Sequence, residues 1–336
     1  MHALAGVRTT VILGSPAVSC AGELPESPAG AAHFAGHPLR VPAELASPDH
    51  RNNGTFGAYA TQNDTCQLVA VTAAHVLMTR DERLAFDDDP RVVLAGYQNS
   101  DIYHPAPGLG RPVVGQRLLD PGALTAGNID AALVTGIPDS WQAVEADRHI
   151  LPGFAFDEVD PDDCPAELRL AEQGWTQYGC PKLDWCASGL ALSGVVPPES
   201  LWPDSQDAEV PTLISVAKRG KKTGLTFGLA CPASHIRVDD EKWPFSGGST
   251  TTVMAMQVAI QPWKVNSIFC DSGDSGAAVW LASEPHGIVG ILHKMFPTDG
   301  GRWGIVCPAT FVENALNISF CVGEVCEDRR VLSSVE

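Results

Sequence analysis

The chain has 336 residues, of which 44% are hydrophobic and 18% charged, so it holds about two domain-sized units and is too apolar for a disordered chain. Its net charge of −18 argues against a basic nucleic-acid-binding surface and against binding to anionic membranes. No stretch reaches the roughly 18 apolar residues of a membrane span. The 32 glycines and 26 prolines favour many short strands over long helices.

The first 50 residues are rich in Ala, Pro, Gly and Ser and predict an extension with little core of its own. Its apolar start is interrupted by Arg8 and Pro16, so it is either a poor secretory signal or a tail. We favour an intracellular location, with secretion as the alternative.

Short apolar runs recur between turn-forming residues from position 54 onward, a pattern typical of short β-strands. In the first half these runs are 57–60, 67–72, 92–97, 112–115 and 129–134. A polar, acidic stretch at 138–211 then predicts long surface loops. The runs resume at 212–216, 223–228, 251–260, 277–281 and 287–292, and residues 311–320 predict a closing helix. Strands in two clusters predict two β-barrels or sandwiches.

The ten cysteines are scattered, and no Cys-x-x-Cys pair occurs. This spacing does not favour a zinc site. Buried thiols, or one or two disulfides, explain these residues better.

Three residues in short motifs are of the types that acyl-transfer chemistry requires. His75 follows the apolar run 71–74, Asp130 lies inside the run 129–134, and Ser275 lies in a Gly-Asp-Ser-Gly turn. Taken singly, each has an ordinary structural explanation, because such residues also form turns, caps and strand edges. Their joint occurrence in the order His, Asp, Ser favours a shared function.

The chemistry that joins these three residues is proton transfer. A serine hydroxyl becomes a good nucleophile when an imidazole accepts its proton. A carboxylate holds that imidazole in one tautomer and offsets its charge. Glycines around the serine allow backbone N–H groups to converge where an oxyanion would form.

These motifs resemble those of the chymotrypsin-like (trypsin-like) serine peptidases, over about residues 54–320. The resemblance implies His75 as general base, Asp130 as its orienting carboxylate and Ser275 as nucleophile, with the N–H groups of Gly273 and Ser275 as the oxyanion hole. It also implies an all-β fold of two antiparallel six-stranded β-barrels, with the active site in the cleft between them and a short C-terminal helix. No metal or organic cofactor is implied.

One feature of the family is missing. Its secreted zymogens expose an Ile-Val-Gly-Gly terminus that pairs with the aspartate before the nucleophile, and this chain has no such tetrapeptide. The segment 218–224 resembles a Gly-Arg-Thr-Thr-Gly segment of bacterial and fungal members without this zymogen switch. We therefore expect Lys218, or its neighbour Arg219, to pair with Asp274, because a buried unpaired carboxylate is costly.

The resemblance also places a substrate-binding region. Phe269 and Cys270 would form the floor of the specificity pocket, with His293 on a wall, and none of them is an acid that would select Lys or Arg. The strand 290–293, which begins at Gly290, would pair with the substrate backbone.

We therefore expect a serine endopeptidase acting on a peptide or protein substrate. The expected organisation is an extension at 1–50, a first barrel at 51–137, an acidic insertion at 138–210, and a second barrel with the helix at 211–336. Two other functions stay open. A catalytically weak member would bind peptides as a regulatory module, and an esterase-like acyl hydrolase would use the same three residues.

Overall fold

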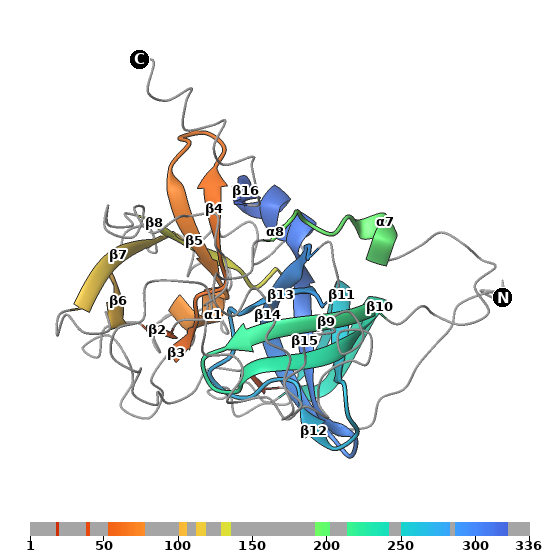
Figure 1. Ribbon diagram of the computed structural model, residues 1–336. Coiled ribbons are helices and arrows are strands. Elements are labelled where there is room, and N and C mark those ends of the chain that lie inside the picture. The colour runs from red at the N-terminus through yellow and green to blue at the C-terminus, as the bar shows by residue number, and fades with distance from the viewer. Residues whose placement is uncertain are drawn as a thin grey trace, which may run out of the picture.

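The computed structural model describes residues 18–19, 38–40, 53–77, 101–105, 112–118, 129–135, 192–201, 214–241, 250–282 and 286–321. Within these ranges the chain forms two eight-stranded β-sheets and three short helices. Figure 1 shows β4 to β8 of the first sheet in orange and yellow, β16 of the same sheet in blue, and β9 to β15 of the second sheet in green to blue. The described residues contain no helix long and apolar enough to cross a membrane.

The first sheet has the strand order β16-β4-β5-β8-β7-β6-β2-β3. Its strands are β2 (Pro38–Arg40), β3 (Asn53–Thr55), β4 (Ala58–Gln62), β5 (Leu68–Thr72), β6 (Asp101–Pro105), β7 (Pro112–Leu118), β8 (Ala132–Thr135) and β16 (Ile318–Phe320). All printed pairings in this sheet are antiparallel. Helix α1 (Ala74–Leu77) follows β5 directly and is buried along its whole length.

The second sheet closes into a six-stranded antiparallel barrel. Its strands are β9 (Ile214–Gly220), β10 (Gly224–Glu241), β11 (Thr250–Pro262), β13 (Ala278–Leu281), β14 (Ile288–Thr298) and β15 (Gly301–Pro308). They pair in the order β14-β13-β9-β10-β11-β15, and the long antiparallel pairing of β14 with β15 closes the ring. Two short strands join it, β1 (Val18–Ser19) on β14 and β12 (Ser267–Ile268), which runs parallel to β15.

The prediction of an all-β fold is confirmed, and one of the two expected barrels is present. The first sheet is open in the described part of the chain, because no pairing there joins its end strands β3 and β16. Of the runs expected to be strands, 92–97 and the first two residues of 212–216 lie outside the described residues, as do 138–191 and 202–210 of the insertion. Helix α7 (Pro198–Leu201) lies in the described part of that insertion.

The predicted closing helix at 311–320 is wrong at both ends. Helix α8 spans Ala309–Leu316 and ends at Asn317, whose φ of 49° is left-handed. Asparagine tolerates this conformation, which stops a helix. The next three residues form β16 and pair antiparallel with β4, so the last strand of the first sheet comes from the C-terminal part of the chain.

The extension also contributes to both sheets. Its described segments are β1, which pairs with β14, and β2, which pairs with β3 and β6. These pairings give residues 18–19 and 38–40 defined places on the two sheets.

A hydrophobic core joins the two sheets into one body. It contains Val69 and Leu133 from the first sheet, Trp280 and Ile291 from the barrel, and Val312 from α8, all of them buried. Burial of each large apolar side chain contributes about 1.5–3 kcal/mol. The shared core therefore holds the loops at the ends of both sheets in fixed relative positions.

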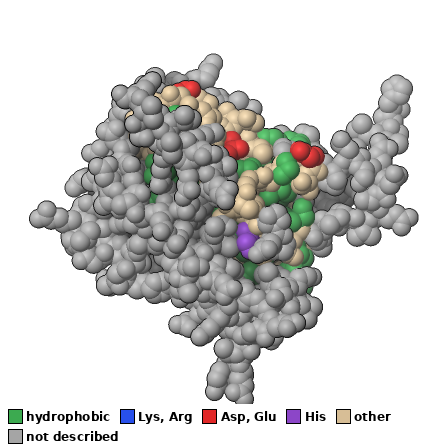
Figure 2. Space-filling model, turned by 45° about the horizontal axis from the view of Figure 1, so that its top comes forward, with side chains coloured by type: hydrophobic (Ala, Val, Ile, Leu, Met, Phe, Trp, Pro, Cys, Tyr) green, Lys and Arg blue, Asp and Glu red, His purple; other side chains and the backbone are tan. Residues whose placement is uncertain are grey.

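On the face shown in Figure 2 the described side chains are mostly apolar or uncharged, with scattered acidic groups and no lysine or arginine.

The five free cysteines among the described residues are Cys66, Cys231, Cys270, Cys307 and Cys321, of which the last four are buried or partly buried.

Candidate active site

His75 and Asp130 are brought together by the pairing of β5 with β8. Thr72 at the end of β5 lies opposite Ala132 at the start of β8, so the residues just beyond these two positions become neighbours. His75 Nδ1 lies 2.7 Å from Asp130 Oδ2, and the backbone N–H of His75 donates to Asp130 Oδ1 at 3.0 Å. The two hydrogen bonds fix both the place and the ring orientation of the histidine.

Ser275 reaches the same histidine from the other sheet. It lies in the loop between β12 and β13, and its Oγ is 2.8 Å from His75 Nε2. The three residues predicted from the sequence therefore form a continuous hydrogen-bonded chain in the order Ser275, His75, Asp130. His75 and Ser275 are almost fully buried, at 2% and 0% exposure.

The charge state of Asp130 determines which nitrogen of His75 carries the proton. Burial by itself raises the pKa of Asp130, but the nearby imidazoles of His75 and His293 hold that pKa well below its usual value. An ionised carboxylate only accepts hydrogen bonds, so His75 Nδ1 carries the proton toward Asp130. His75 Nε2 is then the acceptor that faces the Ser275 hydroxyl.

The loop around Ser275 is held by glycines and by Thr55. Gly273 and Gly276 have φ values of 109° and 91°, a region that side chains rarely adopt. Thr55 of β3 donates from its N–H to the Ser275 carbonyl at 2.7 Å and from its Oγ1 to the Gly273 carbonyl at 2.9 Å. Within the described residues, no acceptor is bound to the N–H of Gly273 or Ser275.

Replacing Gly276 by alanine is expected to destabilise the protein by at least about 2 kcal/mol. A Cβ there would lie 2.0 Å from Thr72 Oγ1 and 2.3 Å from the Thr55 carbonyl oxygen, and the φ of this position is already unfavourable for alanine. Urea unfolding of Gly276→Ala measures the change. The matched control is Gly194→Ala, because a Cβ at Gly194 meets nothing within 4 Å. Equal unfolding midpoints for both variants would contradict the prediction.

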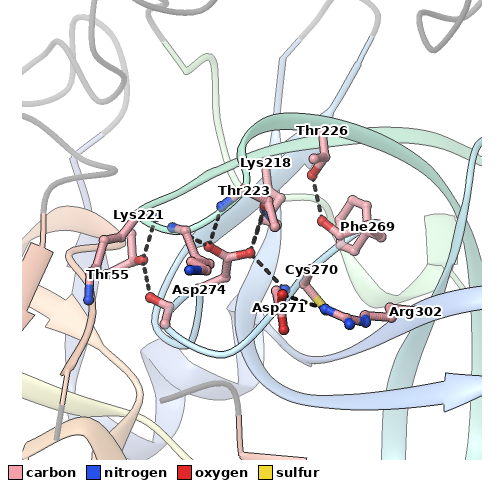
Figure 3. A network of polar contacts seen from close by, with 12 residues as sticks. Thr55, Lys218, Lys221, Thr223, Thr226, Phe269, Cys270, Asp271, Asp274 and Arg302 are labelled. Atoms are coloured by element: carbon pink, nitrogen blue, oxygen red, sulfur yellow. Dashed lines mark hydrogen bonds and ion pairs between the residues drawn. The ribbon is translucent and has the colours of Figure 1, made fainter. Parts of the chain in front are cut away.

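Asp274 is completely buried beside the nucleophile, at the centre of the polar network in Figure 3. Its Oδ1 accepts the N–H groups of Lys222 (2.8 Å) and Thr223 (3.2 Å). Its Oδ2 accepts the Asp271 N–H (2.9 Å) and the Thr223 hydroxyl (2.7 Å) and lies 3.1 Å from Lys218 Nζ. Each oxygen of this carboxylate therefore has several donors.

The sequence left open whether Lys218 or Arg219 faces Asp274, and in the structure it is Lys218. The Lys218 side chain has 0% exposure, and its ammonium also donates to Thr223 Oγ1 at 2.5 Å. Gly220 allows this approach, since a Cβ there would lie 2.3 Å from Asp274 Oδ1. The ammonium lies 5.6 Å from the centre of the Phe269 ring, within cation–π range.

His293 lies against Asp130, a contact that the sequence did not indicate. Its Nδ1 is 3.7 Å from Asp130 Oδ2, and its Nε2 is 2.9 Å from Gln257 Oε1. The His293 carbonyl oxygen lies 3.4 Å from Ser275 Oγ. Burial lowers the pKa of His293, but Cys307 and Asp130 raise that pKa to about 9.

Stability is therefore expected to depend on pH through His293. Its folded pKa of about 9 lies above the unfolded value of 6.5, so its contribution is complete below pH 6.5 and is lost as the pH rises through 9. We expect a Ser275→Ala chain to lose up to about 3 kcal/mol more unfolding free energy between pH 6.5 and 9.5 than a Ser275→Ala/His293→Gln chain. Urea unfolding at both pH values tests this, and equal losses would contradict it.

The structure places two of the residues expected at a specificity pocket in the core of the barrel, and their role at a pocket stays a prediction. Phe269 and Cys270 have 0% exposure and pack in the core of the barrel. The Phe269 backbone and the Cys270 thiol also make hydrogen bonds inside this core. Thr226 Oγ1 donates to the Phe269 carbonyl at 2.6 Å. Cys270 Sγ donates to the Trp303 carbonyl at 3.4 Å.

The expected substrate-pairing strand is also shifted. Gly290 pairs with Val279 of β13 on one side and with Pro308 of β15 on the other, so it has no free edge for another backbone. The pairing of β13 with β14 ends at Ile291, and the loop of the nucleophile binds Leu292, so the edge that these two leave uncovered begins after Leu292. Sequence reasoning did not find this, because the length of β13 sets where the edge begins.

Sequence reasoning also missed three residues of the site. Thr55 holds the loop of Ser275, Thr223 bridges Lys218 and Asp274, and Gln257 holds His293. Only Thr223 had a local signal, because it belongs to the basic segment 218–224. Thr55 and Gln257 reach the site through strand pairing and carry no motif.

No protein-family model matches this chain, and no curated protein matches it significantly. Similar solved structures include protease A of Thermobifida fusca, with 14% identity and a TM-score of 0.40, covering 87% of this chain and 100% of that one. Nocardiopsis protease has 13% identity and a TM-score of 0.43, covering 85% and 97%, respectively. Cellulomonas bogoriensis chymotrypsin has 12% identity and a TM-score of 0.41, covering 85% and 97%. Likeness at this level carries no argument about activity.

Proposed function

We propose that this chain is a serine endopeptidase that uses Ser275, His75 and Asp130. The observation that carries the proposal is the pair of short contacts at His75, 2.8 Å from Nε2 to Ser275 Oγ and 2.7 Å from Nδ1 to Asp130 Oδ2. One imidazole thus joins a hydroxyl to a carboxylate, which is the arrangement required for an activated nucleophile.

The first chemical step follows from this geometry. Ser275 Oγ attacks the carbonyl carbon of the peptide bond while its proton passes to His75 Nε2. The ionised Asp130 stabilises the imidazolium that forms. The tetrahedral intermediate collapses as His75 gives the proton to the leaving amine, and an acyl group remains on Ser275.

The second step repeats the first with water. His75 accepts a proton from a water molecule, the hydroxide attacks the acyl carbon, and the proton returns to Ser275 Oγ as the carboxylic acid product leaves. In both steps the oxyanion would receive hydrogen bonds from the N–H groups of Gly273 and Ser275. Removal of one such donor raises a barrier by about 2.7–4 kcal/mol.

Asp274 and Lys218 support the site without touching the substrate. Their buried ion pair holds the residue before the nucleophile, and the Thr55 contacts hold the carbonyls on either side of it. Lys218 thus supplies a positive charge from within β9, where the secreted zymogens would use a new N-terminus.

A fluorophosphonate probe tests the proposal directly, because it phosphonylates only an activated serine. We expect the wild-type chain to be labelled at Ser275, and the Ser275→Ala and His75→Ala chains to lose that labelling. Ser272→Ala is the matched control, since Ser272 is in the same loop and makes no contact with His75 in the described structure. A folded wild-type chain that reacts no faster than Ser275→Ala contradicts the proposal. That result would favour the alternative function, a catalytically weak module that binds peptides. Labelling without cleavage of any peptide would favour the esterase.

A further inference from the structure

One edge of β14 carries three different partners in succession. β13 pairs with it at Ile288, Gly290 and Ile291. The loop of the nucleophile follows, with Gly276 N–H donating to the Leu292 carbonyl at 2.7 Å and Leu292 N–H to the Ala277 carbonyl at 2.9 Å. The Ser275 hydroxyl then lies 3.4 Å from the His293 carbonyl oxygen. The nucleophile is thus placed where β13 ends.

β1 is the third partner on this edge. Ser19 lies opposite Lys294 and Val18 opposite Met295, in antiparallel register. Because β1 is antiparallel to β14, its chain direction runs from Met295 toward Lys294, and so toward His293 and Ser275. Ser19 is opposite the residue directly after His293, and one strand residue spans about 3.3 Å.

β15 occupies the opposite edge of this part of β14. It pairs with Lys294 and Met295 through Ile305 and Gly304. An extended peptide that is to pair with β14 beside Ser275 therefore has one edge to use, the edge on which β1 lies. A peptide substrate and β1 would compete for the same main-chain groups of Lys294 and Met295.

The nucleophile and its base are both buried. Ser275 has 0% exposure and His75 has 2%, so the nucleophile and its base have almost no contact with solvent. A peptide bond must reach Ser275 Oγ before it can be cleaved. Some part of the chain must therefore move before a substrate can bind.

We propose that the Lys294–Met295 edge of β14 binds the backbone of the peptide substrate, and that the Val18–Ser19 segment holds this edge in cis as an inhibitory strand. This inference rests on the proposed peptidase function and names the regulation of that site. The pairing covers only two residues, which alone bind weakly. Its tether to the same chain gives a high effective concentration, so the segment would block the edge and still be displaceable.

Proline substitution tests the inference in the full-length chain. Proline has no backbone N–H and is excluded from paired strand interiors, so Val18→Pro/Ser19→Pro is expected to release the edge. The matched control is Ala31→Pro/Ala32→Pro, the same change elsewhere in the extension. We take the open form to be the wild-type chain in which Val18–Ser19 has left the edge of β14. If this form is a tenth of the population or less, kcat/KM for a protein substrate such as casein rises about tenfold or more in Val18→Pro/Ser19→Pro. It stays unchanged in the control.

Hydrogen exchange gives a second readout that needs no activity. In a Ser275→Ala background, fragments covering 293–296 are expected to exchange faster with Val18→Pro/Ser19→Pro than with the control substitutions. Equal exchange and equal casein hydrolysis in the two chains would overturn the inference.

Loss of the peptidase activity and loss of the inhibitory strand give different results. The fluorophosphonate probe must also reach the buried Ser275, so labelling is measured in both the wild-type and the Val18→Pro/Ser19→Pro chains, and labelling in either chain reports the proposed function. Labelled chains with no response to the proline pair would overturn the inhibitory strand and leave the peptidase intact. Faster exchange at 293–296 without labelling of Ser275 would overturn the peptidase, and with it the inhibitory role, and would leave only the strand pairing.

Discussion

Replacing Asp130 by asparagine is expected to lower kcat by about 10⁴-fold with little change in fold. The asparagine fills the same space, but its amide donates to His75 Nδ1 where the carboxylate now accepts at 2.7 Å. The imidazole would then carry its proton on Nε2 and could not accept the proton of Ser275. Its charged form would also lose the stabilisation that the carboxylate supplies.

The measurement is the initial rate of peptide hydrolysis by wild type and Asp130→Asn, with circular dichroism to show that both are folded. Asp299→Asn is the matched control, because Asp299 is exposed in the turn between β14 and β15 and should leave the rate unchanged. If Asp130→Asn kept a tenth or more of the wild-type rate, the carboxylate would not have the orienting role proposed for it.

Replacing Lys218 by methionine is expected to lower the free energy of unfolding by about 3–5 kcal/mol. Methionine keeps the length and apolar stem of lysine but leaves the Asp274 carboxylate without its positive partner, in a place where both side chains have 0% exposure. The remaining donors from Thr223, Lys222 and Asp271 satisfy the hydrogen bonds of the carboxylate but not its charge.

Urea unfolding of Ser275→Ala chains measures this effect without self-digestion. Lys222→Met is the matched control, because the Lys222 side chain is exposed and should change stability by less than about 0.5 kcal/mol. Adding Asp274→Asn to Lys218→Met should recover part of the loss, since the uncompensated charge is removed. Stability within 1 kcal/mol of the parent for Lys218→Met would show that the ion pair contributes little.

The strand content was predictable because it rests on local patterns. β5, for example, reads Leu-Val-Ala-Val-Thr in the sequence and is a buried strand in the structure. β16 was not predictable in this way, because Ile318 to Phe320 continue the apolar pattern of the helix before them. The local signal for the break was Asn317, whose left-handed backbone ends α8. The closure of the barrel by β14 and β15 depends on register between strands, which no short pattern specifies.

The residues of the candidate site also fall into two groups, those with a local sequence signal and those placed by long-range contacts. His75 and Ser275 stand in short motifs, and Asp130 became recognisable once those two were seen. His293 was expected beside a pocket but lies against Asp130, because a register shift between Leu292 and Lys294 sets where its side chain goes. Thr55 meets the nucleophile loop across 218 positions of sequence. Such contacts form only when the sheets assemble, so local sequence patterns could not predict them.

The pairing of β16 with β4 has a consequence for the order in which the protein is made. Ser319 Oγ donates to Asn63 Oδ1 across 256 positions, so the first sheet receives this edge strand only after residues 318–320 have been synthesised. Contacts this distant in sequence slow folding, and a domain on the ribosome folds in the order in which its parts emerge. The sheet that holds His75 and Asp130 therefore stays incomplete on a nascent chain. The proposed catalytic residues His75 and Asp130 would then reach a complete sheet only once residues 318–320 have emerged and paired with β4.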